Sequence, residues 1–261
     1  MLRDSSVVYP NEYPIDVVEK PIWLAAKCGQ CDDVLKSISN GEEIEERGGY
    51  MHCTPLLIAS AYDNLDVVTL LIEHCADLLS KDLYYLETPL HASLRRYNAR
   101  TADAKQGSEV SSVLINAMVK RGFTLDSVDE CGRTALHLAV VDNNESMIKH
   151  LLNNGADISA RDQAGTTALK YSILEHNLNI TLILIKYGVN VNERYHHGRI
   201  PVHLCTHSGT EELCRLLLAH GADIKAVDYG GLNALSIISQ HEWVGGIDII
   251  NRESARRNEL V

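Results

Sequence analysis

The chain has 261 residues, of which 45% are hydrophobic and only one is Phe, so we expect a core built from Leu, Ile, Val and Ala. Its formal net charge of −11 argues against a general nucleic-acid binder, because phosphate contacts need clustered Lys and Arg, and it favours a protein partner with a basic surface. No segment approaches the roughly 20 apolar residues that span a bilayer, so no membrane association is predicted.

Residues 1–19 form an N-terminal extension, without the continuous apolar stretch of a signal peptide. After it, helix-start signatures recur at Thr54-Pro55-Leu56, Thr88-Pro89-Leu90, Thr134-Ala135-Leu136, Thr167-Ala168-Leu169, Ile200-Pro201-Val202 and Asn233-Ala234-Leu235. The steps between them are 34, 46, 33, 33 and 33 residues. A fixed period in this range is typical of a stacked repeat protein.

A second series of residues ends the helices that these signatures begin. The Thr hydroxyl accepts a hydrogen bond from an otherwise unpaired amide at a helix start, and Pro suits the first helical position. The stop positions are Gly41, Cys75, Gly122, Gly155, Gly188 and Gly221. Glycine adopts the left-handed backbone of a helix end at little cost, so Cys75 in that conformation should be strained. Start and stop lie 21 residues apart in four repeats, which is enough for two short helices and a turn.

These residues resemble the ankyrin repeat. The best copies of its usual wording are Gly132-Arg133-Thr134-Ala135-Leu136-His137-Leu138-Ala139 and Leu216-Leu217-Leu218-Ala219-His220-Gly221-Ala222-Asp223-Ile224. The resemblance covers about residues 20–243 and implies an all-α ankyrin-repeat solenoid of about seven stacked helix pairs with β-hairpin fingers. The first copy, at 22–26, lacks the Thr-Pro start, and the last loses its second-helix signal at Gly245-Gly246, since terminal repeats are atypical. Residues 244–261 are expected to form a C-terminal cap or tail.

The third repeat contains an irregularity. Its start and stop lie 34 residues apart, so 13 extra residues fall between its helices, at about 99–111. The segment is small and polar, too poor in apolar groups to fold alone, and we expect a tolerated loop. The competing interpretation is a functional basic patch, formed by Arg95, Arg96, Arg100, Lys105, Lys120 and Arg121.

Two groups of Cys and His side chains admit a chemical interpretation, which the repeat pattern disfavours. Cys28 and Cys31 have redox-dithiol spacing, but they fall at the turn between two helices. His203, Cys205 and His207 share one helix and suit zinc by ligand type, yet His203 is the histidine of the repeat signature. No phosphate loop or nucleophile elbow stands out either. We therefore predict no enzyme, no cofactor and no metal site.

Partner binding is expected where the copies differ, because such residues are not needed for stacking. The fingers carry Tyr50, Tyr84, Tyr85, Tyr195 and Tyr229, and the concave ends of the first helices carry Tyr62, Arg95, Arg96, Val141, Leu174 and His207. Tyrosine and arginine are enriched at interfaces, and an apolar spot beside them is typical of an anchor zone. The alternative for the tyrosines is that each lies flat on its own neighbouring finger.

The resemblance implies a monomeric protein-binding module, an adaptor or scaffold. Seven Cys without a disulfide-framework spacing suit a reducing compartment, so we expect the cytoplasm, the nucleus or both. Three alternatives stay open. One is a substrate-recognition subunit of a ubiquitin ligase, although the sequence after Trp243 lacks the pattern of a SOCS box. Another is an ankyrin-type inhibitor of a transcription factor, and the third is the Cys/His metal or redox protein. The acidity could also serve solubility alone.

Overall fold

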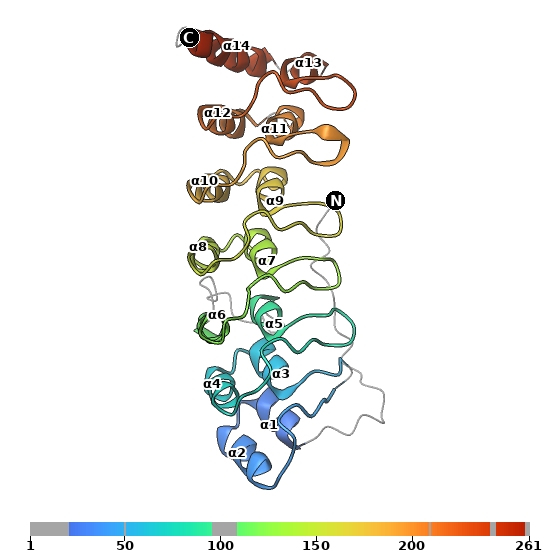
Figure 1. The fold of residues 1–261 in the computed structure, drawn as a ribbon, viewed down its shortest axis with the longest axis vertical. Coiled ribbons are helices and arrows are strands. Elements are labelled where there is room, and N and C mark those ends of the chain that lie inside the picture. The colour runs from blue at the N-terminus through green and yellow to red at the C-terminus, as the bar shows by residue number, and fades with distance from the viewer. Residues whose placement is uncertain (1–20, 50, 96–108, 209, 241–243, 259–261) are drawn as a thin grey trace. The chain divides into compact units, whose positions relative to one another are not determined.

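The computed structural model describes residues 21–49, 51–95, 109–208, 210–240 and 244–258 (Figure 1). Side chains at 206–208, 244, 254 and 257–258 lie outside this description. The described residues divide into two compact units, the first formed by 21–95 with 109–117 and the second by 118–258. In the described part of the chain, no helix is long and apolar enough to cross a membrane.

The first unit consists of helix pairs in which inner helices pack on inner helices and outer on outer. The helices are α1 (Pro21–Cys28), α2 (Cys31–Ser39), α3 (Pro55–Ala61), α4 (Leu65–Glu73), α5 (Pro89–Arg95) and most of α6 (Glu109–Lys120). α3 packs against both α1 and α5, and α2 packs against α4. Residues 99–108 of the predicted insert lie outside the described residues, and its last three, 109–111, belong to α6 and not to a loop.

The second unit repeats the same two layers (Figure 1). The inner layer is α7 (Ala135–Val141), α9 (Ala168–Leu174), α11 (Pro201–Ser208) and α13 (Ala234–Gln240). The outer layer is α8 (Glu145–Asn153), α10 (Leu178–Lys186), α12 (Glu211–Ala219) and α14 (Val244–Asn258), and one short 3-10 turn, η1 (His196–Gly198), lies in a finger. The predicted all-α helix pairs are confirmed.

Helix α14 corrects the expectation that the last repeat loses its second helix. It runs through Gly245 and Gly246, which are poor helix formers. Ile249 and Ile250 are each only 1% exposed, and α14 packs on α12 and α13. Burial of this apolar face offsets the low local propensity, because tertiary packing supplies most helix stability in proteins.

The predicted helix starts are confirmed at the atomic level. The Thr54 hydroxyl accepts from the amide of Leu57 at 3.3 Å, and the Thr167 hydroxyl accepts from the amide of Lys170 at 3.4 Å. At the start of α7, His137 makes a second kind of capping bond, in which its Nδ1 accepts a hydrogen bond from the Thr134 amide at 3.1 Å. Each bond satisfies a donor that the helix itself leaves unpaired.

Two buried histidines also join consecutive repeats. Nε2 of His137 lies 3.1 Å from the carbonyl oxygen of Thr166, and Nε2 of His203 lies 3.1 Å from that of Ala226. Nδ1 of His203 meanwhile accepts from the Ile200 amide at 3.1 Å. With one ring nitrogen accepting and the other facing a carbonyl, each imidazole is neutral with its proton on Nε2. Burial lowers the pKa of both rings and keeps them in this form.

The helix stops have the left-handed backbone that the sequence predicts. Gly155 has φ +88°, and Cys75 has φ +67° at the equivalent place in the first unit. A side chain at Gly155 would meet nothing within 4 Å, so the glycine is there for its backbone freedom and not for space. A non-glycine residue in this region costs on the order of 1 kcal/mol, which identifies Cys75 as a strained stop.

The fingers are hairpin turns closed by few backbone pairs, with isolated bridges at Gly48–Cys53 and Val227–Asn233 among the described residues. A buried or half-buried aspartate shapes several of them from inside. Asp129 Oδ1 accepts from the amides of Cys131 and Arg133 at 2.9 and 2.8 Å. The same kind of hydrogen bond, from a backbone amide of the same finger to the aspartate carboxylate, is made by Asp82, Asp162 and Asp228. The aspartate thus replaces the strand pairing that such a short loop lacks.

Arginines tie consecutive fingers together, in what we call the arginine ladder: Arg47, Arg161 and Arg194. Arg47 donates to the carbonyls of His52, in its own finger, and Lys81, in the next, both at 2.7 Å. Arg194 donates to Gly198 at 2.8 Å and to Val227 at 3.1 Å, and Arg161 bonds the oxygen of Arg194 at 3.1 Å. Each guanidinium therefore spans two fingers, as its several donors allow.

Candidate protein-interaction surfaces

The inner surface of the second unit is defined by Val141 and Leu174 with their charged neighbours Asp142, Glu175 and Lys170. Val141 and Leu174 end α7 and α9 at equivalent positions of consecutive repeats, and these two helices pack together. Their side chains are 47% and 45% exposed, as the sequence predicted. Large apolar side chains that stay exposed on adjacent helices form an apolar spot suited to a partner.

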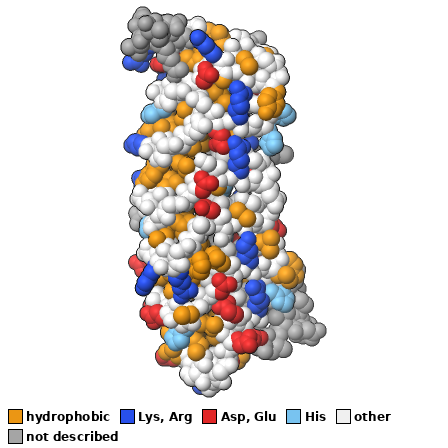
Figure 2. Space-filling model, viewed as in Figure 1, with side chains coloured by type: hydrophobic (Ala, Val, Ile, Leu, Met, Phe, Trp, Pro, Cys, Tyr) orange, Lys and Arg blue, Asp and Glu red, His pale blue; other side chains and the backbone are white. Residues whose placement is uncertain are grey.

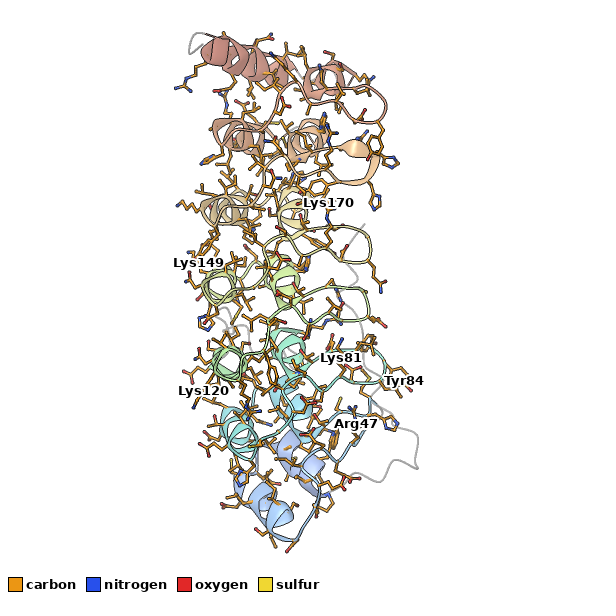
Figure 3. The ribbon with its side chains drawn as sticks, in the orientation of Figure 1. Arg47, Lys81, Tyr84, Lys120, Lys149 and Lys170 are labelled. Carbon is orange, nitrogen blue, oxygen red and sulfur yellow. The ribbon has the colours of Figure 1, made fainter. Side chains whose placement is uncertain are left out.

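Charged residues surround this spot. Asp142 and Glu175, the C-caps of α7 and α9, are both exposed. Lys170 lies one turn before Leu174 on the same helix, and Figure 3 labels it on α9. Its Nζ is 3.4 Å from the Thr166 hydroxyl and 5.5 Å from the centroid of the Tyr195 ring. The surface is therefore an apolar centre with a charged rim, as in many protein interfaces.

Tyr195 does not lie where the sequence interpretation placed it. We expected an exposed finger tyrosine, but the side chain is only 5% exposed. Its hydroxyl is 3.3 Å from the Thr167 hydroxyl, and its ring lies 6.0 Å from the Arg161 guanidinium carbon. Burial raises the pKa of the phenol well above its usual range. The expectation that Tyr195 forms part of a partner-facing surface is wrong, because the ring belongs to the packing between two repeats.

A different finger presents the apolar tip of the first unit, which consists of Leu83, Tyr84 and Leu86. These side chains are 59%, 43% and 43% exposed, and Figure 3 shows Tyr84 at the end of its finger. Leu86 has φ +52°, in the region that favours glycine. The Asp82 carboxylate holds this turn by accepting from the amides of Tyr84 and Tyr85 at 2.8 and 2.6 Å. The sequence prediction included Tyr84 but missed the leucines.

Tyr229 is exposed to a partner and also packs on its neighbouring finger. It is 80% exposed, yet its ring lies over the neighbouring finger, where a Cβ added at Gly198 would come within 2.5 Å of it. Its amide donates to the carbonyl of His197 at 2.8 Å. The ring is therefore accessible and supported on one side, which reduces the entropy lost when a partner covers the other side.

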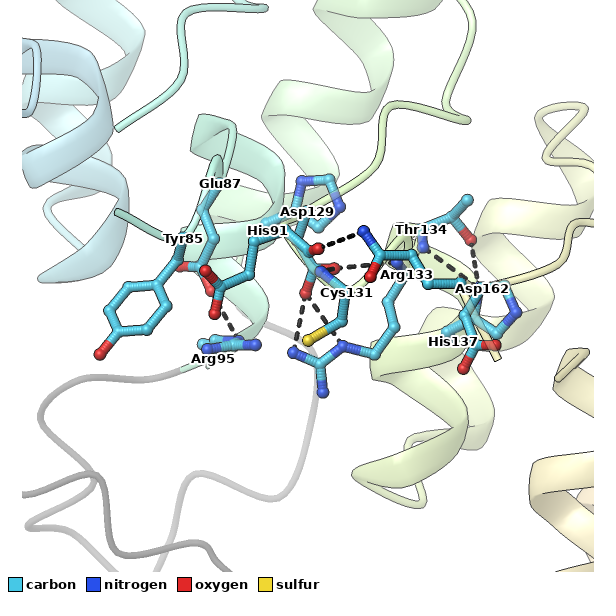
Figure 4. A network of polar contacts seen from close by, with 12 residues as sticks. Tyr85, Glu87, His91, Arg95, Asp129, Cys131, Arg133, Thr134, His137 and Asp162 are labelled. Carbon is cyan, nitrogen blue, oxygen red and sulfur yellow. Dashed lines mark hydrogen bonds and ion pairs between the residues drawn. The ribbon is translucent and has the colours of Figure 1, made fainter. Parts of the chain in front are cut away.

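The first-unit candidates Tyr62, Tyr85 and Arg95 are only half-buried and are already engaged with neighbours. The Arg95 guanidinium pairs with the buried Glu87 carboxylate at 2.6 Å and lies 5.8 Å from the Tyr85 ring (Figure 4). Lys27 lies 5.9 Å from the ring of Tyr62. Three further candidates, Tyr50, Arg96 and the side chain of His207, fall outside the described residues, although His207 belongs to α11.

Family comparisons agree with this architecture. A model of three consecutive ankyrin repeats matches residues 103–195, and a model of the single ankyrin repeat matches residues 51–83 and 197–229. The chain belongs to the ankyrin repeat family. Among solved structures, the ankyrin repeat domain of Bcl-3, described as a unique member of the IkappaB protein family, is similar with a TM-score of 0.79. The match covers 90% of this chain and 100% of that one at 23% identity, which is a likeness in fold. No curated protein sequence is similar enough to count as a match.

The ankyrin fold accounts for the Cys and His groups that suggested chemistry. His203 uses both ring nitrogens in the repeat framework, so neither is available to a metal in this structure. Burial raises the pKa of the Cys31 thiol, the opposite of what a reactive dithiol needs. Among the described residues, no three His, Cys, Asp or Glu side chains are grouped as metal ligands. The sequence prediction missed Cys214, whose sulfur lies beside that of Cys205.

The charged groups of the ankyrin framework in the second unit are mostly satisfied within it. Arg133 donates through Nε and Nη2 to Asp129 Oδ2 at 2.9 and 2.7 Å (Figure 4). The Tyr171 hydroxyl donates to Asp162 at 2.7 Å. Burial raises the pKa of Tyr171. On the face drawn in Figure 2, basic side chains lie next to acidic ones and not in one uniform field. These ionic contacts therefore shape the fingers.

Proposed function

We propose that this ankyrin repeat chain is a non-enzymatic protein-binding adaptor or scaffold that holds its partner on the inner surface of the second unit. The observation that carries the proposal is the exposure of Val141 and Leu174, 47% and 45%, on adjacent inner helices. Exposed apolar side chains at positions not needed for stacking lose little when the chain is alone and gain burial when a partner covers them. Ankyrin repeats are a protein-interaction scaffold, which supports the same conclusion.

The rim of the spot indicates the chemistry of the partner. Asp142 and Glu175 add two carboxylates beside the apolar centre, on a chain whose net charge is −11. An apolar patch flanked by Lys or Arg would match this surface, and charge complementarity would speed its encounter. We infer a monomer that acts in the cytoplasm or nucleus, where a reducing milieu is compatible with seven cysteines that form no disulfide.

An inhibitor of a transcription factor is the second candidate, because masking a basic DNA-binding surface is one task that such a rim would suit. The likeness in fold to the Bcl-3 ankyrin domain, of the IkappaB family, is compatible with it. No observation in the described residues favours a ubiquitin-ligase role.

The test is the double variant Val141→Asp with Leu174→Asp, compared with wild type in proximity labelling and pull-down. Hot-spot truncations cost about 2 kcal/mol or more each, about thirtyfold in affinity, so partner capture should be lost. The helical circular dichroism signal and the melting curve should stay close to wild type. The matched control is Leu178→Asp with Val227→Asp, two side chains 38% and 44% exposed elsewhere in the same unit, which should retain binding.

Two outcomes would contradict the proposal. An unfolded Val141→Asp, Leu174→Asp variant would mean that these residues belong to the core. A folded variant that captures the same proteins as wild type would move the interaction to the finger tips, at Tyr84 or Tyr229.

A further inference from the structure

Two buried thiols meet within the sixth repeat. Cys205 lies in α11 and Cys214 in α12, the inner and outer helices of one pair. They are 0% and 1% exposed, and their sulfur atoms are 2.6 Å apart. The Cys205 sulfur also lies 3.2 Å from the carbonyl oxygen of Val202, so it is held at the helix interface.

The same pair of positions brings side chains together in the fifth repeat. In the fifth repeat, Ser172 and Thr181 have the same nine-residue separation, and their hydroxyl oxygens are 2.9 Å apart. In the first unit, the hydroxyl of Ser93, at the position of Cys205, lies 2.9 Å from that of Ser111, which is one turn before the position of Cys214. Ankyrin geometry therefore directs these two side chains at each other, and the sixth repeat carries cysteine at both places.

We propose that Cys205 and Cys214 are a site of reversible oxidation, at which a peroxide or a small-molecule disulfide converts the two thiols to an intramolecular disulfide. With a peroxide, one thiolate attacks the O–O bond and becomes a sulfenic acid, releasing one water or alcohol. The second thiol attacks that sulfur, the S–O bond breaks, and water leaves. The two cysteines lose two electrons and two protons in total, and the peroxide takes up these electrons and protons. A thiol reductant reverses the reaction by exchange.

The position of the pair sets its behaviour. Because both thiols are buried, an oxidant reaches them only when the repeat opens locally, so they should react more slowly than the exposed Cys28, Cys75 and Cys131. Once formed, the disulfide covalently joins α11 to α12 and resists that opening. The sixth repeat directly follows the one that carries Leu174, so oxidation would stiffen the edge of the inner surface.

The experiment treats the purified full-length chain with hydrogen peroxide, alkylates it under denaturing conditions, cleaves it after glutamate, which separates Cys205 from Cys214 at Glu211 and Glu212, and maps the peptides by mass spectrometry. We expect a linked peptide pair containing Cys205 and Cys214 that disappears after reduction with dithiothreitol. The urea midpoint should rise on oxidation. It should not rise in Cys205→Ala with Cys214→Val, which copies the buried Ala59 and Val68 of the second repeat and should fold normally.

A second variant keeps the proposal testable if the first is unstable. Ser172→Cys with Thr181→Cys places the same pair in the fifth repeat and should yield a second linked peptide pair. The proposal is overturned if Cys205 and Cys214 are recovered as separately alkylated or over-oxidised residues after peroxide, or if either is linked to a different cysteine.

Discussion

The two units display exposed apolar area in different places on the same type of repeat. In the first unit it includes a finger tip, at Leu83, Tyr84 and Leu86, whereas in the second it includes the ends of inner helices, at Val141 and Leu174, as well as Tyr229 on a finger. Two second-unit fingers turn at Gly132 and Gly165, with φ +76° and +67°, where the finger of Leu83 and Tyr84 has Leu86 at φ +52°. Stacking constrains only the residues that contact neighbouring repeats. Exposed apolar side chains can therefore occur at different places in different repeats.

The largest effect on stability is expected from the aspartates that shape the fingers in both units. Asp129→Ala should destabilise the chain by about 2–3 kcal/mol, because two backbone amides and the Arg133 guanidinium lose a buried charged acceptor. Asp82→Ala should cost less, since the hydrogen bonds described for Asp82 come from backbone amides alone. Urea unfolding of the two variants measures the difference. An equal or larger loss in Asp82→Ala would show that the apolar finger depends on its aspartate as strongly as the glycine-turn finger does.

Acid should weaken the second unit through its buried histidines. Burial lowers the pKa of His137 and His203, so the folded state stays neutral while the unfolded chain takes up protons below about pH 6.5. The stabilisation is fully present above that pH and is lost as the pH falls towards the folded-state pKa values. The urea midpoint should therefore drop between about pH 7.5 and about pH 5.5.

His137→Gln should reduce this pH dependence, because glutamine can occupy the site without titrating. His220→Gln, at an exposed helix end, is the matched surface variant. If the drop is as steep in His137→Gln as in His220→Gln, the titration of His137 does not contribute to it.

A smaller change is expected at the strained stop of the first unit. Cys75→Gly should raise the free energy of unfolding by up to about 1 kcal/mol, because φ +67° costs glycine nothing. Gly155→Ala in the second unit is the converse change and should lower stability by a similar amount. Urea midpoints report both, and a lower midpoint for Cys75→Gly would contradict the strain at this residue.

The smallest effect is expected when the apolar finger tip of the first unit is made charged. Leu83→Asp with Tyr84→Asp should change the affinity for the partner captured through Val141 and Leu174 by less than about threefold, which corresponds to well under 1 kcal/mol. Titration of the purified partner against this variant measures it. A loss comparable with that of the inner-helix double variant would mean that both units contact one partner.

The sequence predicted what local chemistry decides. Thr54 and Thr167 begin helices because a hydroxyl can cap an amide, and Cys75 takes a left-handed backbone because the helix ends there. The exposure of Val141 and Leu174 was predictable because their positions in the repeat are not needed for stacking.

What the sequence did not predict depends on neighbouring repeats. Tyr195 is buried because Thr167, 28 residues earlier, and Arg161 approach it, and a pattern within one finger contains neither. Helix α14 forms through Gly245 and Gly246 because Ile249 and Ile250 pack on the preceding pair. The contact between Cys205 and Cys214 was readable only by aligning them with Ser172 and Thr181.

The arginine ladder bears on how such a chain gains or loses repeats. Arg47 reaches a carbonyl 34 residues ahead, whereas Arg161 and Arg194 each reach one 33 residues ahead. The donor and acceptor residues thus lie one repeat length apart in the sequence, wherever the repeat is taken to begin. A duplication or deletion of one such unit within the second half would bring each arginine a new acceptor in the same register, so the number of fingers can change by genetic recombination without leaving a guanidinium unpaired.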